Sequence, residues 1–343
     1  MNPETLRPPH HHTYNEIKSQ TEAWQQAWEL VRAASLPAAG DYGQVIFTGC
    51  GSTYYLSLAA AALYQELTGR SARAVPGGEL LLNSQTVQTN QKTLLVAVSR
   101  SGTTTETVKA VEKFKAEERG DVLVISNYDE VLSTYGDINI VIPRGREQSV
   151  AQTRSFASMY VAATAVCAKM AGRDDLLAAM GKLPAMGDRL IGTYEESAKS
   201  IGENLSFDRF YFLGSGIRYG LACEVNLKMK EMTLTHSEPF HFLEFRHGPM
   251  SMVNGNALVV GMLSDANRAH EARVLSEMKM LGGAVFSLGG EQADVAFGGD
   301  IPEQVRGVLY LPILQLMALY RSLAKDLNPD RPANLTAVVK LDF

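Results

Sequence analysis

The feature that most constrains the fold is an apolar run closed by a glycine turn, which occurs twice. Val45 to Gly51 reads VIFTGCG, and Phe210 to Gly216 reads FYFLGSG, about 165 residues later. Such a run is typical of a strand buried on both faces of a parallel sheet and followed by a helix. Further apolar runs alternate with helical patterns after each copy. The sequence therefore predicts an α/β protein with two tandem, flavodoxin-like, doubly wound parallel-sheet domains, helices on both faces, related by duplication.

The expected elements divide the chain into five parts. The expected strands are 44–47, 73–75, 94–98, 122–126 and 138–142 in the first half; in the second half, after the apolar run that begins at Phe210, they are 257–263 and 284–288. The expected parts are an N-terminal helical segment 1–34, a first domain 35–172, linking helices 173–203, a second domain 204–330, and a tail 331–343 ending in a strand-like VVKL. A long helix over 150–171 is expected to close the first half.

Composition excludes several functional classes. The 343 residues are 45% hydrophobic with a formal net charge of −5, which suits two domains with cores and disfavours a nucleic-acid surface. The N-terminus is polar, so no signal peptide is expected, and the apolar runs are short for a membrane span. Three scattered cysteines predict a cytoplasmic protein without disulfides or a metal centre. His10 to His12 are interpreted as a solvated lead-in, and no cofactor is expected.

The stretch Thr93 to Gly120 predicts a phosphate site. An apolar run ends in Ser99-Arg100-Ser101-Gly102-Thr103-Thr104-Thr105, and a helix pattern follows. Thr103 and Glu106 have the spacing of a capping box. The unsatisfied N–H groups of a helix start bind anions, the hydroxyls allow close approach, and Arg100 adds charge. An ordinary capped helix is the alternative. The second half has Asp265 at the matching turn, and its carboxylate would repel phosphate. The sequence therefore predicts one phosphate site per chain, in the first half.

The second half carries a candidate acid–base face. Glu224, Lys228 and Glu231 are spaced i, i+4 and i+7 on an otherwise apolar helix, so they share one face. This helix follows the Gly214-Ser215-Gly216 turn at the carboxyl edge of a sheet, where α/β proteins bind ligands. A solvated salt-bridge ladder is the alternative.

The segment Thr235 to Pro249 is read as a loop rich in titratable groups. It contains His236, His241 and His247 together with glutamates and an arginine. Their spacings match no standard metal signature, so general acid–base chemistry is the preferred interpretation.

The order of four motifs resembles the sugar isomerase (SIS) family over nearly the whole chain. The motifs are GCGST, SRSGTTTE, ACEVNLKMKE and EFRHGP. The likeness is greatest to the isomerase half of glucosamine-6-phosphate synthase and to stand-alone amino-sugar-phosphate deaminases and fructosyl-amine deglycases. These motifs are specific for the family and much weaker for the substrate.

The resemblance implies a role for each matching residue. Glu231 would move a proton between the first two sugar carbons, with Glu224 and Lys228 in support, and His247 would open the sugar ring, reaching in from the neighbouring subunit of a homodimer. The implied substrate-binding residues are Gly51, Ser52, Thr53, Ser99, Arg100, Ser101, Thr104, Val150 and Gln152. The family often has Gln in place of Arg100, and the synthase has Ser in place of Gln152.

Two departures from the synthase bear on the reaction. The chain shows no glutaminase domain, so synthesis of glucosamine 6-phosphate from glutamine is not expected. Ala337 stands where the synthase tail has a Schiff-base lysine, and Lys340 comes three residues later.

The resemblance therefore implies an enzyme that acts on a hexose or hexosamine 6-phosphate. The first hypothesis is a deaminase that converts glucosamine 6-phosphate to fructose 6-phosphate and ammonia. A fructosyl-amine-phosphate deglycase or a ketose–aldose phosphosugar isomerase is the enzymatic alternative. A non-catalytic sugar-phosphate sensor is the alternative from another class.

Overall fold

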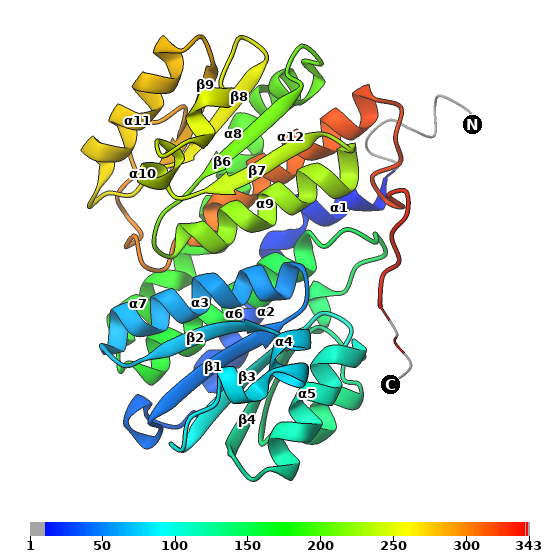
Figure 1. Ribbon diagram of the computed structural model, residues 1–343, viewed down its shortest axis with the longest axis vertical. Helices are drawn as coiled ribbons and strands as arrows, with labels where there is room; N and C mark the ends of the chain where they lie inside the picture. Colours follow the sequence, from blue (N-terminus) through cyan, green and yellow to red (C-terminus); the bar gives the residue numbers. More distant parts are fainter. Residues whose placement is uncertain (1–10, 340, 342–343) are drawn as a thin grey trace. The chain divides into compact units, whose positions relative to one another are not determined.

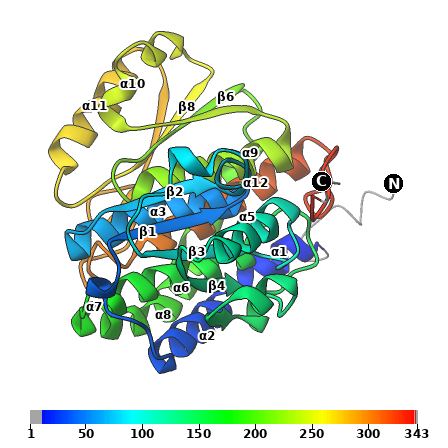
Figure 2. The same cartoon turned by 60° about the horizontal axis from the view of Figure 1, so that its bottom comes forward.

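The computed structural model describes residues 11–339 and 341, which form two compact units that do not follow chain order. One unit comprises residues 20–147, 154–181 and the tail from 336, and the other comprises 11–19, 148–153 and 182–335. Each unit is built on one five-stranded parallel sheet covered by helices (Figures 1 and 2). The predicted pair of doubly wound parallel-sheet domains is therefore confirmed.

The unit that contains the first sheet has strand order β2-β1-β3-β4-β5. Its strands are β1 (Gln44–Gly49), β2 (Ala72–Pro76), β3 (Thr93–Ser99), β4 (Gly120–Ser126) and β5 (Ile138–Val141). Helices α4 (Gly77–Leu82) and α5 (Thr105–Ala116) pack on one face, and α3 (Ser52–Thr68) and α6 (Arg154–Met170) pack on the other, with α2 (Gln20–Ala33) against α6 and the short α7 (Asp174–Ala179) after it. Strand β3 is buried along its whole length, as expected for a central strand.

The unit that contains the second sheet repeats this arrangement with order β7-β6-β8-β9-β10. Its strands are β6 (Arg209–Leu213), β7 (His236–Phe240), β8 (Ala257–Met262), β9 (Ala284–Gly289) and β10 (Val295–Ala296). Its helices are α1 (His12–Lys18), α8 (Leu183–Glu203), α9 (Arg218–Thr233), α10 (Phe242–Phe245), α11 (Arg268–Met280) and α12 (Leu311–Ala324). Helices α9 and α12 lie on one face, and α10 and α11 on the other.

Several sequence expectations were wrong in detail. Residues 236–240 form strand β7 rather than a loop. Pro239 argued against a strand here, but β7 lies at the edge of its sheet, where a proline is tolerated. The helix expected over 150–171 begins only at Arg154. The described part of the N-terminal helical segment expected over 1–34 forms two helices, α1 and α2, which are separated at Ser19. The described tail residues 333–339 contain no strand, and Lys340 lies outside the described residues, as does His10.

One segment, Gly307–Ala324, is long and apolar enough to cross a membrane, contrary to the expectation from the apolar runs. It is 89% buried inside the protein, which is typical of a core helix. Length and composition therefore give only weak evidence for a membrane span.

Candidate functional site

The hydroxyl-rich turns of the first sheet lie at one edge. β1 and β3 are adjacent and parallel, so the turns that follow them, at Gly51 and at residues 99–104, come out on the same side. Helix α3 begins at Ser52 and α5 begins at Thr105, which brings two helix N-termini to this edge. Ser52, Thr53 and Ser99 are buried there. We call the set Ser52, Thr53, Ser99, Ser101 and Thr104 the cradle.

Hydroxyl groups hold the turn after β3 in shape. Ser99 Oγ accepts a hydrogen bond from the Gly102 N–H at 3.2 Å, and Ser101 Oγ accepts one from the Thr103 N–H at 3.2 Å. The predicted Thr103–Glu106 capping box does not form, because the N-cap residue of α5 is Thr104. The Thr104 hydroxyl makes no cap hydrogen bond, so the first turn of α5 keeps N–H groups for an anion.

The Arg100 guanidinium is engaged by a buried carboxylate. Its Nη1 lies 3.1 Å from Glu147 Oε1, and the Glu147 side chain is 0% exposed. Its Nη2 donates to the Ala337 carbonyl at 2.7 Å, and the Leu341 N–H donates to Thr105 Oγ1 at 3.1 Å. The tail therefore runs beside the cradle, and Ala337 presents its backbone oxygen to Arg100. The anion-binding capacity of the cradle then rests mainly on hydroxyls and helix N-termini.

Helix α9 brings together the predicted acid–base residues. Lys228 Nζ lies 3.5 Å from Glu224 Oε1 and donates a hydrogen bond to Glu231 Oε2. The side chains of Glu224 and Lys228 are 1% and 2% exposed, whereas that of Glu231 is 19% exposed. The alternative of a solvated salt-bridge ladder is therefore wrong. The buried Lys228 therefore lies between two carboxylates, and Glu231 is the member of the three that solvent or substrate can reach.

Val150 and Gln152 lie in a short loop, 148–153, that is anchored to α1 and to the segment after α12. The Glu16 carboxylate accepts hydrogen bonds from the Gln148 N–H at 2.5 Å and from the Ser149 hydroxyl. The Val150 N–H donates to the Asp330 carbonyl at 2.9 Å. Gln152 Oε1 is buried without a hydrogen-bond partner among the described residues, as expected for a group that a ligand satisfies.

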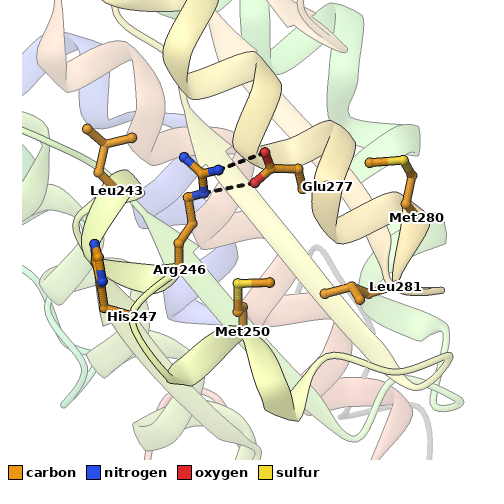
Figure 3. Close-up of a pocket in the computed structure, with 7 residues that line it drawn as sticks. All are labelled: Leu243, Arg246, His247, Met250, Glu277, Met280 and Leu281. Carbon is orange, nitrogen blue, oxygen red and sulfur yellow. Dashed lines mark hydrogen bonds and ion pairs between the residues drawn. The ribbon is translucent and has the colours of Figure 1, made fainter.

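His247 lies on the surface beside a pocket of about 630 Å³. The pocket is lined by Leu243, Arg246, His247, Met250, Glu277, Met280 and Leu281 (Figure 3). Arg246 and Glu277 form a two-point ion pair across it, at 2.9 Å and 3.0 Å. Leu243, Met280 and Leu281 are 53%, 78% and 45% exposed, so the pocket that His247 lines also has uncovered apolar side chains.

The other titratable groups in this region are less suited to proton transfer. The His241 ring stacks on Tyr219 with centroids 3.9 Å apart, and burial lowers the pKa of His241 while Glu244 opposes the shift. Burial raises the pKa of the Cys223 thiol on α9 to about 11. Within residues 11–339 and 341, no group of three or more His, Cys, Asp or Glu side chains is placed to hold a metal ion.

Sequence reasoning missed two carboxylates that organise these residues. Glu147 neutralises Arg100 from 47 positions along the chain, and Glu16 holds the 148–153 loop from 132 positions away. Neither lies in a motif or at a helical spacing from its partner, so no local signal could have revealed them.

The sequence of the chain is similar to a known domain family and to curated proteins. The SIS domain family matches residues 41–169 and 206–296, more than half of the chain. A glutamine–fructose-6-phosphate aminotransferase (isomerizing) of Methanothermobacter thermautotrophicus is 27% identical over 316 residues, covering 88% of this chain and 52% of that protein. The corresponding protein of Sulfolobus acidocaldarius is 29% identical over 311 residues, covering 88% of this chain and 50% of that protein. The chain spans about half the length of the curated relatives it matches.

Solved structures are similar to the chain over almost its full length. Glucosamine-6-phosphate deaminase of Thermotoga maritima superposes with a TM-score of 0.82 at 25% identity, covering 96% of this chain and 100% of that one. Tagatose-6-phosphate ketose/aldose isomerase of Escherichia coli superposes with a TM-score of 0.82 at 24% identity, covering 94% and 95%. The second likeness shows the fold alone.

Proposed function

The chain belongs to the SIS family of phosphosugar isomerases, and from this premise we propose that it deaminates an amino-sugar phosphate, converting glucosamine 6-phosphate to fructose 6-phosphate and ammonia. The observation that carries the proposal is the α9 face, where buried Lys228 lies between Glu224 and the partly exposed Glu231. The likeness to the Thermotoga maritima deaminase supports it.

The proposed chemistry starts from the phosphate. The cradle hydroxyls and the N-terminus of α5 bind the phosphate oxygens, and each charge-assisted hydrogen bond contributes about 1.5–3 kcal/mol. Such remote binding energy can orient the reacting carbons. In this proposal the buried Gln152 carbonyl oxygen accepts a hydrogen bond from a sugar hydroxyl.

The proton transfer is assigned to α9. After ring opening by His247, Glu231 removes the proton from C2 of the amino aldose while the C1 carbonyl oxygen takes up a solvent proton, which gives an enolamine. Glu231 then returns its proton to C1, which converts the enolamine to a C2 imine, and water hydrolyses this imine to the ketose and ammonia. Lys228 supports the transfer because its hydrogen bond to Glu231 holds that carboxylate in position. A positioned acid–base group of this kind contributes about 10²–10⁴-fold to the rate.

We also propose that the enzyme acts as a cytoplasmic homodimer in which His247 serves the neighbouring subunit. Exposed His247 beside uncovered Leu243, Met280 and Leu281 supports this arrangement. A H247A variant mixed with an E231Q variant should regain part of the activity through hybrid dimers. Analytical ultracentrifugation of the mixture should show a dimer.

The deciding experiment for the reaction measures ammonia and fructose 6-phosphate released from glucosamine 6-phosphate. We expect the unchanged protein to release both in equal amounts, and E231Q to lose at least about 10²-fold in kcat while still binding the sugar phosphate. Retained turnover by E231Q would refute its assignment as the base. Isomerisation without ammonia would favour the ketose–aldose isomerase, and phosphosugar binding without turnover of any amino sugar would favour the sensor.

A further inference from the structure

The second sheet has a turn that matches the cradle in position and in local bonding. The turn after β8 begins with Ser264, whose Oγ accepts the N–H of Asn267 at 2.9 Å, as Ser99 Oγ accepts the N–H of Gly102 at 3.2 Å. β8 is the third strand of its sheet in chain order and lies next to the first, β6, as β3 lies next to β1 (Figure 1). The backbone of an anion-binding turn is therefore preserved in the second half.

A carboxylate from the same chain fills this turn. Glu303 Oε2 accepts hydrogen bonds from the Asp265 N–H at 3.0 Å and the Ala266 N–H at 3.4 Å. Glu303 Oε1 lies 2.5 Å from Nη1 of Arg218, the residue that opens α9 after the turn that follows β6. The carboxylate thus lies at the carboxyl edge of two adjacent parallel strands, where open α/β sheets bind their ligands.

Two arginines, Arg218 and Arg306, lie at this turn together with the carboxylates of Asp265 and Glu271. The Arg218 side chain is 7% exposed, and its Nε has no hydrogen-bond partner among the described residues. A tetrahedral phosphate, with more oxygens than a carboxylate, could satisfy it. The Asp265 carboxylate is turned to Arg306 Nη2 at 2.5 Å, so its charge is already compensated.

We propose that the β6–β8 edge of the second sheet is a latent phosphate site, kept closed by the Glu303 carboxylate acting as an internal ligand. Its natural class of ligand is a phosphate or phosphate monoester bound by Arg218 and the N–H groups of Asp265 and Ala266. The duplicated fold thus retains two anion sites, of which the second is occupied by the chain itself.

The test counts inorganic phosphate bound per chain by isothermal titration calorimetry in phosphate-free buffer. We expect E303A to bind one phosphate more per chain than the unchanged protein, and the double variant R218A/E303A to lose that additional site. E291A removes an exposed carboxylate near the same edge and is the matched control, which should bind like the unchanged protein. Because the readout is a difference, failure of the proposed cradle would lower the counts of all these proteins equally.

The fold of each variant is checked by circular dichroism before titration. If E303A does not fold, E303Q is titrated in its place, and we expect it to bind the additional phosphate. Its amide keeps the size of the Glu303 side chain but lacks the negative charge that holds Arg218. Folded E303A or E303Q with the same phosphate count as the unchanged protein would overturn the proposal.

Discussion

Replacing Lys228 by methionine tests the acid–base face most directly. At 3.5 Å from Glu224, and with an effective dielectric constant of about 20, the attraction between the two charges is about 5 kcal/mol before desolvation is counted. Removing one member of a buried pair leaves the other charge uncompensated, which costs about 3–5 kcal/mol. We therefore expect K228M to lower the free energy of unfolding by about 3–5 kcal/mol.

The control for K228M lies on the same helix. Lys230 is exposed, so K230M should change the free energy of unfolding by less than about 0.5 kcal/mol in urea titrations. The double variant E224Q/K228M removes a carboxylate together with the ammonium, and its loss should be smaller than the sum of the single losses by about 0.5–3 kcal/mol.

The same variant tests the part that Lys228 plays in activity. Because Lys228 donates a hydrogen bond to Glu231, the proposed base, K228M should lower kcat/KM by at least about 10-fold, whereas K230M should leave it unchanged. A K228M variant as stable and as active as K230M would contradict the assignment.

Two further predictions concern Asp330 and the cradle. Burial alone would raise the pKa of Asp330, but hydrogen bonds from Thr13 and the charge of His11 outweigh it and lower the pKa. The ionised Asp330 carboxylate therefore stabilises the fold at pH values above its pKa in the unfolded chain, about 3.9. This stabilisation is lost as the pH falls through the lower pKa of Asp330 in the folded protein. Urea titrations should show that the unchanged protein has a higher free energy of unfolding than D330N. This difference should be largest near pH 7 and vanish well below pH 3.9; a difference that does not vary with pH would contradict the prediction. Gly102 has φ +67°, and an added Cβ would lie 3.1 Å from Glu130 Cβ, so G102A should cost about 1–2 kcal/mol and weaken phosphate binding, whereas G78A, with open space, should do neither.

Periodicity predicted the parts of the site that lie within one element. The i, i+4, i+7 spacing placed Glu224, Lys228 and Glu231 on one face because α9 is a regular helix through all three. The hydroxyl turn after β3 was equally local. These features depend on neighbours in sequence, which is why composition and spacing were enough to find them.

The features that escaped prediction depend on residues distant in sequence. The pairing of Arg100 with Glu147 changes the expected source of charge at the cradle, and no spacing rule connects the two. The occupation of the second turn by Glu303 likewise required a chain segment 38 residues beyond Asp265. Strand β7 was missed because a proline usually argues against a strand, and only its edge position permits one.

That edge strand also influences how copies of the chain can associate. The Phe240 carbonyl accepts the Gly214 N–H, so the backbone groups of Phe240 face β6 and those of Pro239 face outward. Because proline has no N–H, the outer edge of β7 lacks a hydrogen-bond donor at Pro239, while the hydrogen bonds between β7 and β6 are kept. The neighbouring Glu238 adds a negative charge to this edge strand. Sheets with such edges resist strand-to-strand addition, which protects the chain from aggregation during folding. Any self-association should then proceed through side-chain surfaces rather than through a continuous intermolecular sheet.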